Sequence, residues 1–230
     1  MTVELISHTE KPLATIAMAA STCYKSVPNE KIVIGCIKTR HFSVTEHSSF
    51  TFKVTGLSRS AMAQITRHRI GSYSIESQRY VSYTDGVEFV DPVFANNKIE
   101  EIFTNNVMSS LRDYEEMMEN GAKAEDARAV LPNAMPTTMV CTFNLRSFAN
   151  VCNERLCSAA QKEIRDMVRE MKKRVIEIFR YESDEFADFL DKHYLVPKCR
   201  AKEICYCTER EEKCCGMSPH INKIKVKVGV

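Results

Sequence analysis

The strongest constraint on the fold is a long amphipathic segment, residues 97–119. Its apolar residues recur at spacings of three and four, which is the period of an α-helix, and Asn120-Gly121 supplies a stop signal. The residues expected to point inward are Ile99, Ile102, Phe103, Val107, Leu111, Tyr114 and Met118. A helix with one apolar face must bury that face against another element, so helix packing is expected to dominate the fold.

Helical patterns recur along the rest of the chain. The other segments expected to be helical are 12–24, 59–67, 123–131, 145–158, 161–181 and 184–193, with Ser58 and Ser183 as N-caps. The helix over 161–181 should bury Ile164, Met167, Val168, Met171, Val175, Ile178 and Phe179. Strands are expected at 49–55 and 137–143, and an extended or looped segment at 68–83. Because strands and helices do not alternate regularly, we predict an α+β fold, a helix-rich single domain with a small, mostly antiparallel sheet.

The composition is that of a globular domain. Hydrophobic residues make up 44% and charged residues 27% of the 230 residues, which suits one compact core. The net charge of +2 is too mild to indicate a nucleic-acid partner, and no apolar run approaches the ~18 residues of a membrane span. The N-terminus has no signal-peptide pattern, so we expect a soluble cytoplasmic protein without a membrane partner.

The last 34 residues differ in composition, and we divide the chain into a main domain, 1–196, and a Cys-rich C-terminal appendage, 197–230. Five of the ten cysteines lie in this appendage: Cys199, Cys205, Cys207, Cys214 and Cys215. Such a cluster could hold zinc or an iron–sulfur cluster, or could consist of free or redox-active thiols. The spacing matches no standard zinc ribbon and contains no Cys-x-x-Cys pair, so we favour thiols and predict no metal.

A cationic stretch between Leu57 and Tyr83 contains Arg59, Arg67, His68, Arg69 and Arg79, with Glu76 as its only acid. Arginine forks bind phosphate through paired N–H donors, and nearby serine hydroxyls add further donors. Charge alone leaves three alternatives open: a solvated basic loop, a site for a phosphate-bearing small ligand, and a nucleic-acid patch. Neither a Gly-x-Gly-x-x-Gly nor a Walker motif occurs, so a nucleotide would not bind through those loops.

The tripeptide Arg67-His68-Arg69, followed after seven intervening residues by Ser77-Gln-Arg-Tyr, resembles the signature of the flavin-dependent thymidylate synthases. Other segments resemble this family in the same order. They are His41-Phe-Ser-Val-Thr-Glu-His, Gln64, Ala127-Arg-Ala-Val-Leu-Pro, Asn144-Leu-Arg-Ser-Phe-Ala-Asn, Arg155 and Gln161-x-Glu-Ile. The resemblance extends over about residues 13–190.

The resemblance implies a homotetrameric enzyme with active sites between subunits, whose catalytic domain is residues 1–196. It would methylate C5 of dUMP to give dTMP, with 5,10-methylenetetrahydrofolate as carbon donor and NADPH-reduced FAD as hydride source. No covalent enzyme nucleophile is implied. A guanidinium beside the uracil would stabilise negative charge at N3 and O4, and Arg155 is the residue to which we assign this catalytic role.

The resemblance also implies individual contacts. FAD would be held by Ser43, Glu46, Arg67, His68, Arg69, Asn144, Arg146 and Asn150. Arg146 and Asn150 are four residues apart, so they should share a helical face. The dUMP site would contain Gln64, Arg67, Ser77, Gln78, Arg79, Arg128 and Arg155, with Arg79 and Arg128 on the phosphate. Only the resemblance assigns His41 to a folate or flavin pocket.

Two positions depart from the family pattern. Ser74-Ile75 stands where the family often has Asn-Glu, and Glu76 cannot simply replace the missing acid, because a shift of one residue in an extended segment reverses the side chain. Ala159 stands where a flavin-side histidine is often found.

Several alternatives remain open. Ser77 could act as a nucleophile only beside a base, for which His68 is the nearest candidate in sequence, and we favour a positioning hydroxyl. A thiolate from Cys152 or Cys157 is less favoured, because helical cysteines are usually core residues. The alternative functions are a non-catalytic nucleotide- or RNA-binding module and a flavin oxidoreductase with another acceptor.

Overall fold

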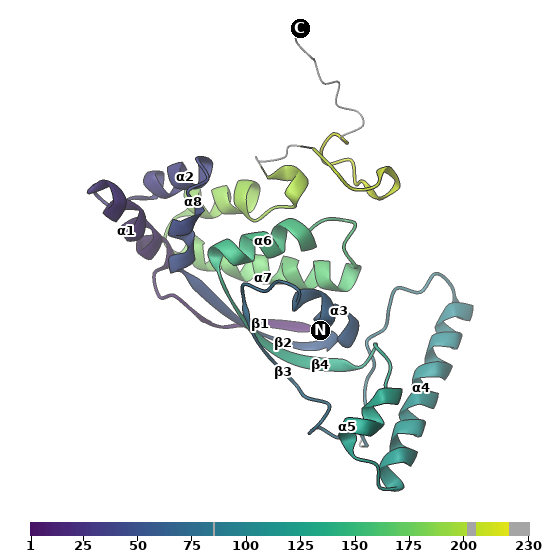
Figure 1. The fold of residues 1–230 in the computed structure, drawn as a ribbon. Helices are drawn as coiled ribbons and strands as arrows, with labels where there is room; N and C mark the ends of the chain where they lie inside the picture. The colour runs from purple at the N-terminus through teal and green to yellow at the C-terminus, as the bar shows by residue number, and fades with distance from the viewer. Residues whose placement is uncertain (85, 202–205, 221–230) are drawn as a thin grey trace. The chain divides into compact units, whose positions relative to one another are not determined.

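The computed structural model describes residues 1–84, 86–201 and 206–220 (Figure 1). Its centre is a four-stranded antiparallel sheet with the strand order β1-β2-β4-β3. The strands are β1 (Thr2–His8), β2 (Ser49–Ser58), β3 (Ser72–Ile75) and β4 (Pro136–Asn144). The predicted α+β class is therefore confirmed.

The described part of the chain also contains helices. They are α1 (Pro12–Tyr24), α2 (Glu30–Lys38), α3 (Arg59–Ile65), α4 (Asn97–Glu119), α5 (Ala124–Ala127), α6 (Leu145–Arg155), α7 (Lys162–Arg180) and α8 (Asp184–Phe189). Four 3₁₀ turns cover Phe42–His47, Arg128–Val130, Lys198–Arg200 and Glu211–Lys213, and one π-helical turn covers Leu190–Tyr194. Within the described parts of the chain, no helix has the length and apolar character needed to cross a bilayer.

The contacts divide the chain into two compact units. Unit 1 comprises residues 1–2, 53–67 and 73–140, and unit 2 comprises residues 3–52, 68–72 and 141–230. Strands β2 and β4 contribute residues to both units. The predicted boundary between residues 196 and 197 stays a prediction.

The core of unit 2 lies where two helices cover the sheet. On β2, Phe50 packs against Phe179 of α7 with ring centroids 5.8 Å apart, and Phe52 packs against Phe148 of α6 at 5.9 Å. Phe148 also contacts Phe143 of β4 at 6.3 Å. Helices α6 and α7 pack against each other, as Figure 1 shows. This packing fixes α6, the helix on which several expected site residues lie.

The core of unit 1 is smaller. Leu111 and Tyr114 of α4 pack with Tyr83, Ala127 and Met135, all of them buried. Helices α4 and α5 contact each other (Figure 1). Tyr83 follows Ser77 and Arg79 in the chain, so its burial in this cluster fixes one end of the loop that carries them.

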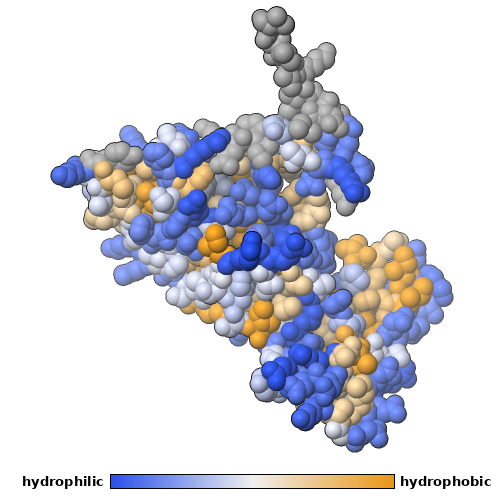
Figure 2. Space-filling model, viewed as in Figure 1, coloured by the Kyte–Doolittle hydropathy of each residue, from blue (hydrophilic) through white to orange (hydrophobic). Residues whose placement is uncertain are grey.

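Helix α4 has the predicted bounds, but its predicted apolar face is only partly buried. Its buried residues begin at Val107, whereas Ile99 and Ile102 near its start are 46% and 51% exposed, so the expectation that both point inward is wrong. The helix begins where the Asn96 side chain accepts a hydrogen bond from the Ile99 amide, before the segment reaches the core. Figure 2 shows apolar side chains gathered on the surface over α4.

Other boundaries differ modestly from the prediction. Ser58 and Ser183 cap α3 and α8 as predicted, with their side chains accepting from Ala61 and Phe186. The helix expected over 123–131 is α5 followed by a 3₁₀ turn, because Leu131 before Pro132 is extended. In α7, Ile176 is buried and Ile178 is not.

Candidate active site

Helix α6 positions the first group of expected site residues. It begins at Leu145 because the side chain of Asn144 accepts a 2.8 Å hydrogen bond from the Ser147 amide, which is an N-cap. One face of the helix, including Phe148, is buried. Arg146 and Asn150 lie on the opposite, exposed face, one helical turn apart, and line the same cavity. The predicted shared face of these two residues is therefore observed.

The 3₁₀ turn Phe42–His47 packs against α6 and brings a carboxylate to it. The turn buries Val44 and Thr45 and leaves Ser43 and Glu46 exposed. Glu46 lies 2.5 Å from the Arg146 guanidinium. Both side chains are nearly half-exposed, so the pair orients Arg146 more than it stabilises the fold. His41 precedes this turn and is exposed.

The end of α6 places an arginine against the tripeptide at residues 67–69. Nε of Arg155 donates a 3.0 Å hydrogen bond to Nε2 of His68, which lies 87 positions earlier in the chain. Burial, with a smaller effect from the Arg155 charge, lowers the pKa of His68 from 6.5 to about 4. The imidazole is therefore neutral at pH 7 and accepts this bond. His68 is half-buried, whereas Arg67 and Arg69 on either side are exposed.

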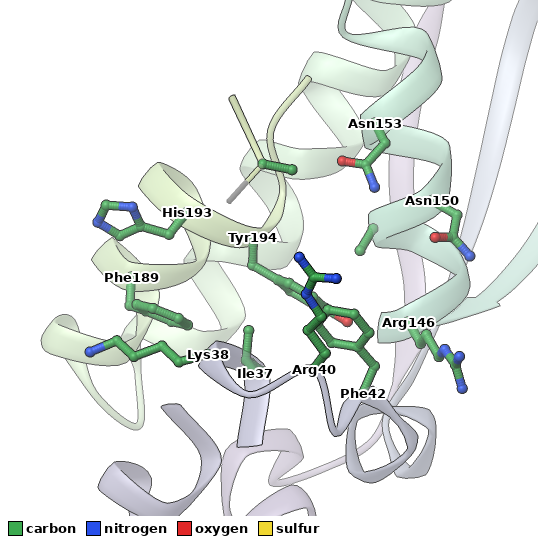
Figure 3. A pocket seen from close by; sticks show the side chains of 12 residues that line it. Ile37, Lys38, Arg40, Phe42, Arg146, Asn150, Asn153, Phe189, His193 and Tyr194 are labelled. Carbon is green, nitrogen blue, oxygen red and sulfur yellow. The ribbon is translucent and has the colours of Figure 1, made fainter. Parts of the chain in front are cut away.

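A cavity of about 260 Å³ opens beside α6 in unit 2. Its lining is Ile37, Lys38, Arg40, Phe42, Arg146, Ala149, Asn150, Asn153, Phe189, His193, Tyr194 and Ala201. Figure 3 shows Arg146, Asn150 and Asn153 on the α6 wall, Lys38, Phe189 and His193 on the opposite wall, and Arg40 between them. None of the described residues that line it is acidic, so the cavity suits an anionic ligand with a flat apolar part.

Several residues of this cavity were not expected from the sequence. Phe42 and Tyr194 form its aromatic floor, with ring centroids 5.7 Å apart, and Tyr194 is hydrogen-bonded to Thr45. Arg40 has a φ of 67°, a left-handed conformation that is rare for a side chain other than glycine. The positive charge of Lys38 and Arg40 was the only available signal, and it lies outside the 57–83 stretch.

Unit 1 holds the residues expected at the phosphate, and it brings two of them together. Arg79 contacts the Glu125 carboxylate through Nε at 3.0 Å and through Nη2 at 2.8 Å. Nε of Arg128 donates a 3.0 Å hydrogen bond to the carbonyl oxygen of the same Glu125. The two arginines, 49 positions apart in the numbering, therefore converge on one residue. A phosphate dianion would suit this pair of forks.

The other residues of unit 1 that are expected at the nucleotide make contacts within their own segments. Ser77 accepts hydrogen bonds from the Arg79 amide through Oγ and from the Tyr80 amide through its carbonyl, and so shapes the turn that carries Arg79. Gln78 follows it and is half-buried. Gln64, on α3, donates to the Ser60 carbonyl of its own helix at 3.2 Å. These contacts suit the positioning role proposed for the Ser77 hydroxyl.

Glu76 is committed to an internal network of unit 1. The Tyr83 hydroxyl donates to Glu76 at 2.8 Å, and Arg59 lies 4.0 Å from the same carboxylate. Burial, and then the hydrogen bond to Glu76, raises the pKa of Tyr83 to about 12. Glu76 and Arg59 of the cationic stretch therefore stabilise the loop from within.

The two cysteines that flank Arg155 differ in their surroundings. Cys152 is fully buried, and burial raises the pKa of its thiol well above the ordinary value. A thiolate at this position is therefore strongly disfavoured at neutral pH. Cys157 is half-buried and lines a separate small cavity with Cys199 and Cys207.

Comparison with known proteins gives a consistent result. The family model described as "Thymidylate synthase complementing protein" matches residues 4–179. The flavin-dependent thymidylate synthase of Geobacter sulfurreducens is 40% identical over 186 residues, which are 74% of this chain and 80% of the relative. The protein of the same name from Pyrococcus abyssi is 33% identical over 226 residues, covering 91% of this chain and 90% of the relative.

Solved structures share the fold. The flavin-dependent thymidylate synthase of Helicobacter pylori, solved with FAD and dUMP, superposes with a TM-score of 0.65 at 24% identity, over 80% of this chain and 99% of that chain. The UMP/dUMP methylase PolB of Streptomyces cacaoi gives a TM-score of 0.71 at 20% identity, over 85% and 96%. Since the family model covers most of the sequence and relatives of the same name align along it, the chain belongs to the flavin-dependent thymidylate synthase family.

Proposed function

We propose that this chain converts dUMP to dTMP by reductive methylation at C5 of the uracil, with FAD as its cofactor. The observation that carries the proposal is the 3.0 Å bond between Arg155 and His68. It joins two of the motif segments that resemble the family and fixes the direction of a permanently charged guanidinium. A neutral His68 holds Arg155 without cancelling its charge, and we propose that this charge acts on a developing anion.

The residues of unit 2 fit a flavin cofactor. The cavity beside Arg146 and Asn150 offers Lys38 and Arg40 to an anionic group. Oδ1 of Asn153 is buried and has no hydrogen-bond partner among the residues described, so it offers an acceptor to a ligand N–H or O–H group. We assign FAD contacts to Ser43, Glu46, Arg67, His68, Arg69, Asn144, Arg146 and Asn150. When bound, the flavin supplies the hydride, which no side chain can provide.

The chain's own residues would hold and polarise dUMP. Arg79 and Arg128 would bind the phosphate, and the nucleotide would displace Glu125 from Arg79. Gln64, Arg67, Ser77 and Gln78 would complete the nucleotide site. Arg155 would stabilise negative charge at N3 and O4 of the uracil, which makes C5 a better nucleophile without a covalent bond to the protein.

We further propose 5,10-methylenetetrahydrofolate as the carbon donor and NADPH as the reductant, with His41 beside the folate or flavin. We also propose a homotetramer with active sites between subunits. Self-association is supported by three exposed apolar residues of α4: Ile99, Ile102 and Met108. Apolar side chains grouped on a surface are typical of protein–protein interfaces, where their burial is favourable. The division into a catalytic domain, 1–196, and an appendage, 197–230, and the cytoplasmic location remain part of this proposal.

The phosphate assignment is tested by dUMP titration of Arg79→Ala and Arg128→Ala. Each should bind dUMP about 10–100-fold more weakly, since a hydrogen bond to a charged group contributes roughly 1.5–3 kcal/mol. Their flavin content, measured from the visible absorption spectrum, should be retained. Arg112→Ala, which removes an exposed arginine from α4, is the matched control. Normal dUMP binding by both variants would refute the assignment.

The role of Arg155 is tested by separating turnover from binding. Arg155→Ala should lower the turnover number about 100-fold or more, as loss of one preorganised charge donor does. The dissociation constant for dUMP should change less than tenfold.

NADPH- and folate-dependent loss of label from C5 of dUMP distinguishes the proposed reaction from a flavin oxidoreductase with another acceptor. Binding that ignores dUMP but falls steeply with salt would instead favour an RNA-binding module.

A further inference from the structure

Five thiols gather at the C-terminal end of α6, outside the proposed active site. Cys157, Cys199 and Cys207 line one small cavity of about 50 Å³, together with Asn153 and Glu154 of α6. The side chain of Cys214 lies close enough to Cys207 to raise its pKa. Cys215 lies close enough to Cys199 to affect its charge. The described cysteines form no disulfide.

The chain after α8 is held in place by specific contacts. Lys198 lies 3.9 Å from Glu154 of α6, and the Ser218 hydroxyl donates a 2.8 Å hydrogen bond to the Cys199 carbonyl. The Cys207 amide donates to the Pro219 carbonyl at 2.8 Å. The 3₁₀ turn Glu211–Lys213 lies between Cys207 and Cys214, which are seven positions apart and close enough for Cys214 to affect the pKa of Cys207.

A resident metal is the obvious alternative for such a cluster, but the arrangement does not favour it. Among residues 1–84, 86–201 and 206–220, no three His, Cys, Asp or Glu side chains are placed to hold a metal ion. Burial is the largest of the effects that raise the pKa of Cys199 and Cys207.

We propose that Cys207 and Cys214 form an oxidisable dithiol, which exchanges with small-molecule disulfides to give an intramolecular Cys207–Cys214 disulfide. Cys214 is half-buried, whereas Cys207 is only 3% exposed, so Cys214 is the thiol that an external disulfide reaches first. Cys207 then attacks from within. The inference does not depend on the proposed function.

The exchange is balanced in two steps. The Cys214 thiolate attacks one sulfur of glutathione disulfide, forming a mixed disulfide and releasing one glutathione thiolate. The Cys207 thiolate then attacks the Cys214 sulfur, forming the protein disulfide and releasing the second glutathione. Overall, two protein thiols lose two hydrogens and one glutathione disulfide becomes two glutathione molecules. Because each attacking group is a thiolate, the rate should rise between pH 7 and pH 9.

The test is incubation of the full-length protein with glutathione disulfide, followed by alkylation and peptide mass mapping. We expect a peptide joined through Cys207 and Cys214, retained in Cys205→Ser and Cys215→Ser and lost in Cys214→Ser. Cys207→Ser should instead accumulate a glutathione adduct on Cys214. Cys23→Ser, which removes an exposed thiol of α1, is the matched control and should not affect the link.

Three results would overturn the proposal. The first is a link that survives in Cys214→Ser, and the second is a stable adduct on Cys214 of the wild-type protein with no internal disulfide. The third is stoichiometric zinc in the purified protein that must be removed by a chelator before the thiols react, which would identify the cluster as a metal site.

Discussion

Replacement of His68 by glutamine should remove a pH dependence from the stability of the protein. In the folded chain His68 is neutral, because burial and the nearby Arg155 disfavour its protonation, and its pKa falls from 6.5 to about 4. Glutamine can still accept the Arg155 hydrogen bond through its amide oxygen, but it has no proton to bind in this range.

The sign and size of the effect follow from linkage. Between pH 6.5 and pH 4 the unfolded chain binds a proton at His68 and the folded chain does not, so the free energy of unfolding falls as the pH falls through this range. The full pKa change corresponds to about 3 kcal/mol at most. His68 is partly open to solvent, which screens the effect, so we expect a loss of about 1–2 kcal/mol between pH 7 and pH 4.5.

The measurement is urea unfolding of the wild type and of His68→Gln at pH 7, 6, 5 and 4.5. Other groups titrate in both proteins, so the quantity of interest is the difference between the two pH profiles. His8→Gln, which replaces an exposed histidine on β1, serves as control and should follow the wild type. Parallel profiles for wild type and His68→Gln would refute a neutral, half-buried His68. A wild type that gains stability on acidification relative to the variant would reverse the sign and refute the argument outright.

Three smaller predictions concern other parts of the chain. Cys152→Ala should have a turnover number within about threefold of the wild type, and it should lose roughly 1–2 kcal/mol of stability because removal of the buried sulfur leaves a cavity. A large loss of turnover would instead support a thiolate mechanism. Ser183→Ala should cost about 1–2 kcal/mol in chemical denaturation, because the cap of α8 and a hydrogen bond to Glu30 are both lost, and no change would contradict this. Ile102→Lys should shift the protein to a smaller species in light scattering, whereas an unchanged mass would exclude this face of α4 from assembly.

The long helices were predictable because their signals are local. Helix α4 has its predicted bounds, and α7 differs from its predicted range by one residue at each end. Periodicity and caps are properties of neighbouring residues, so a single sequence contains them. The burial of a helix face is not a local property, since it depends on which distant residues pack against that face. Ile99 and Ile102 have the right spacing, but the core of unit 1 reaches α4 only at Val107.

Two elements gave weak signals and were missed. Helix α2 contains Gly35 and a run of β-branched residues, both poor helix formers, and it depends on the Asn29 cap and on burial of Val33 and Ile37. Strand β1 buries only Val3 of its seven residues, so it lacks the alternation that marks a half-buried strand.

The candidate site shows the same division between local and tertiary information. The shared face of Arg146 and Asn150 follows from helical spacing. The Arg155–His68 bond and the Arg79–Glu125 contact join distant segments, and no local rule specifies them, whereas Arg128 and Glu125 are three residues apart. Family motifs indicated which residues matter, whereas only the fold shows which carboxylate or imidazole each arginine contacts.

The contact between Arg79 and Glu125 yields a prediction opposite in sign to the usual loss of function. If a phosphate dianion takes the place of the Glu125 carboxylate at Arg79, removal of that carboxylate should strengthen dUMP binding. The exposed ion pair contributes no more than about 1 kcal/mol, so Glu125→Gln should lower the dissociation constant for dUMP about two- to fivefold at low salt, and less at high salt. Glu101→Gln, which breaks the exposed Lys98 pair of α4, is the matched control and should leave binding unchanged. Weaker binding by Glu125→Gln would mean that Glu125 orients Arg79 for the nucleotide instead of competing with it, and the phosphate would then have to approach Arg79 beside an intact carboxylate.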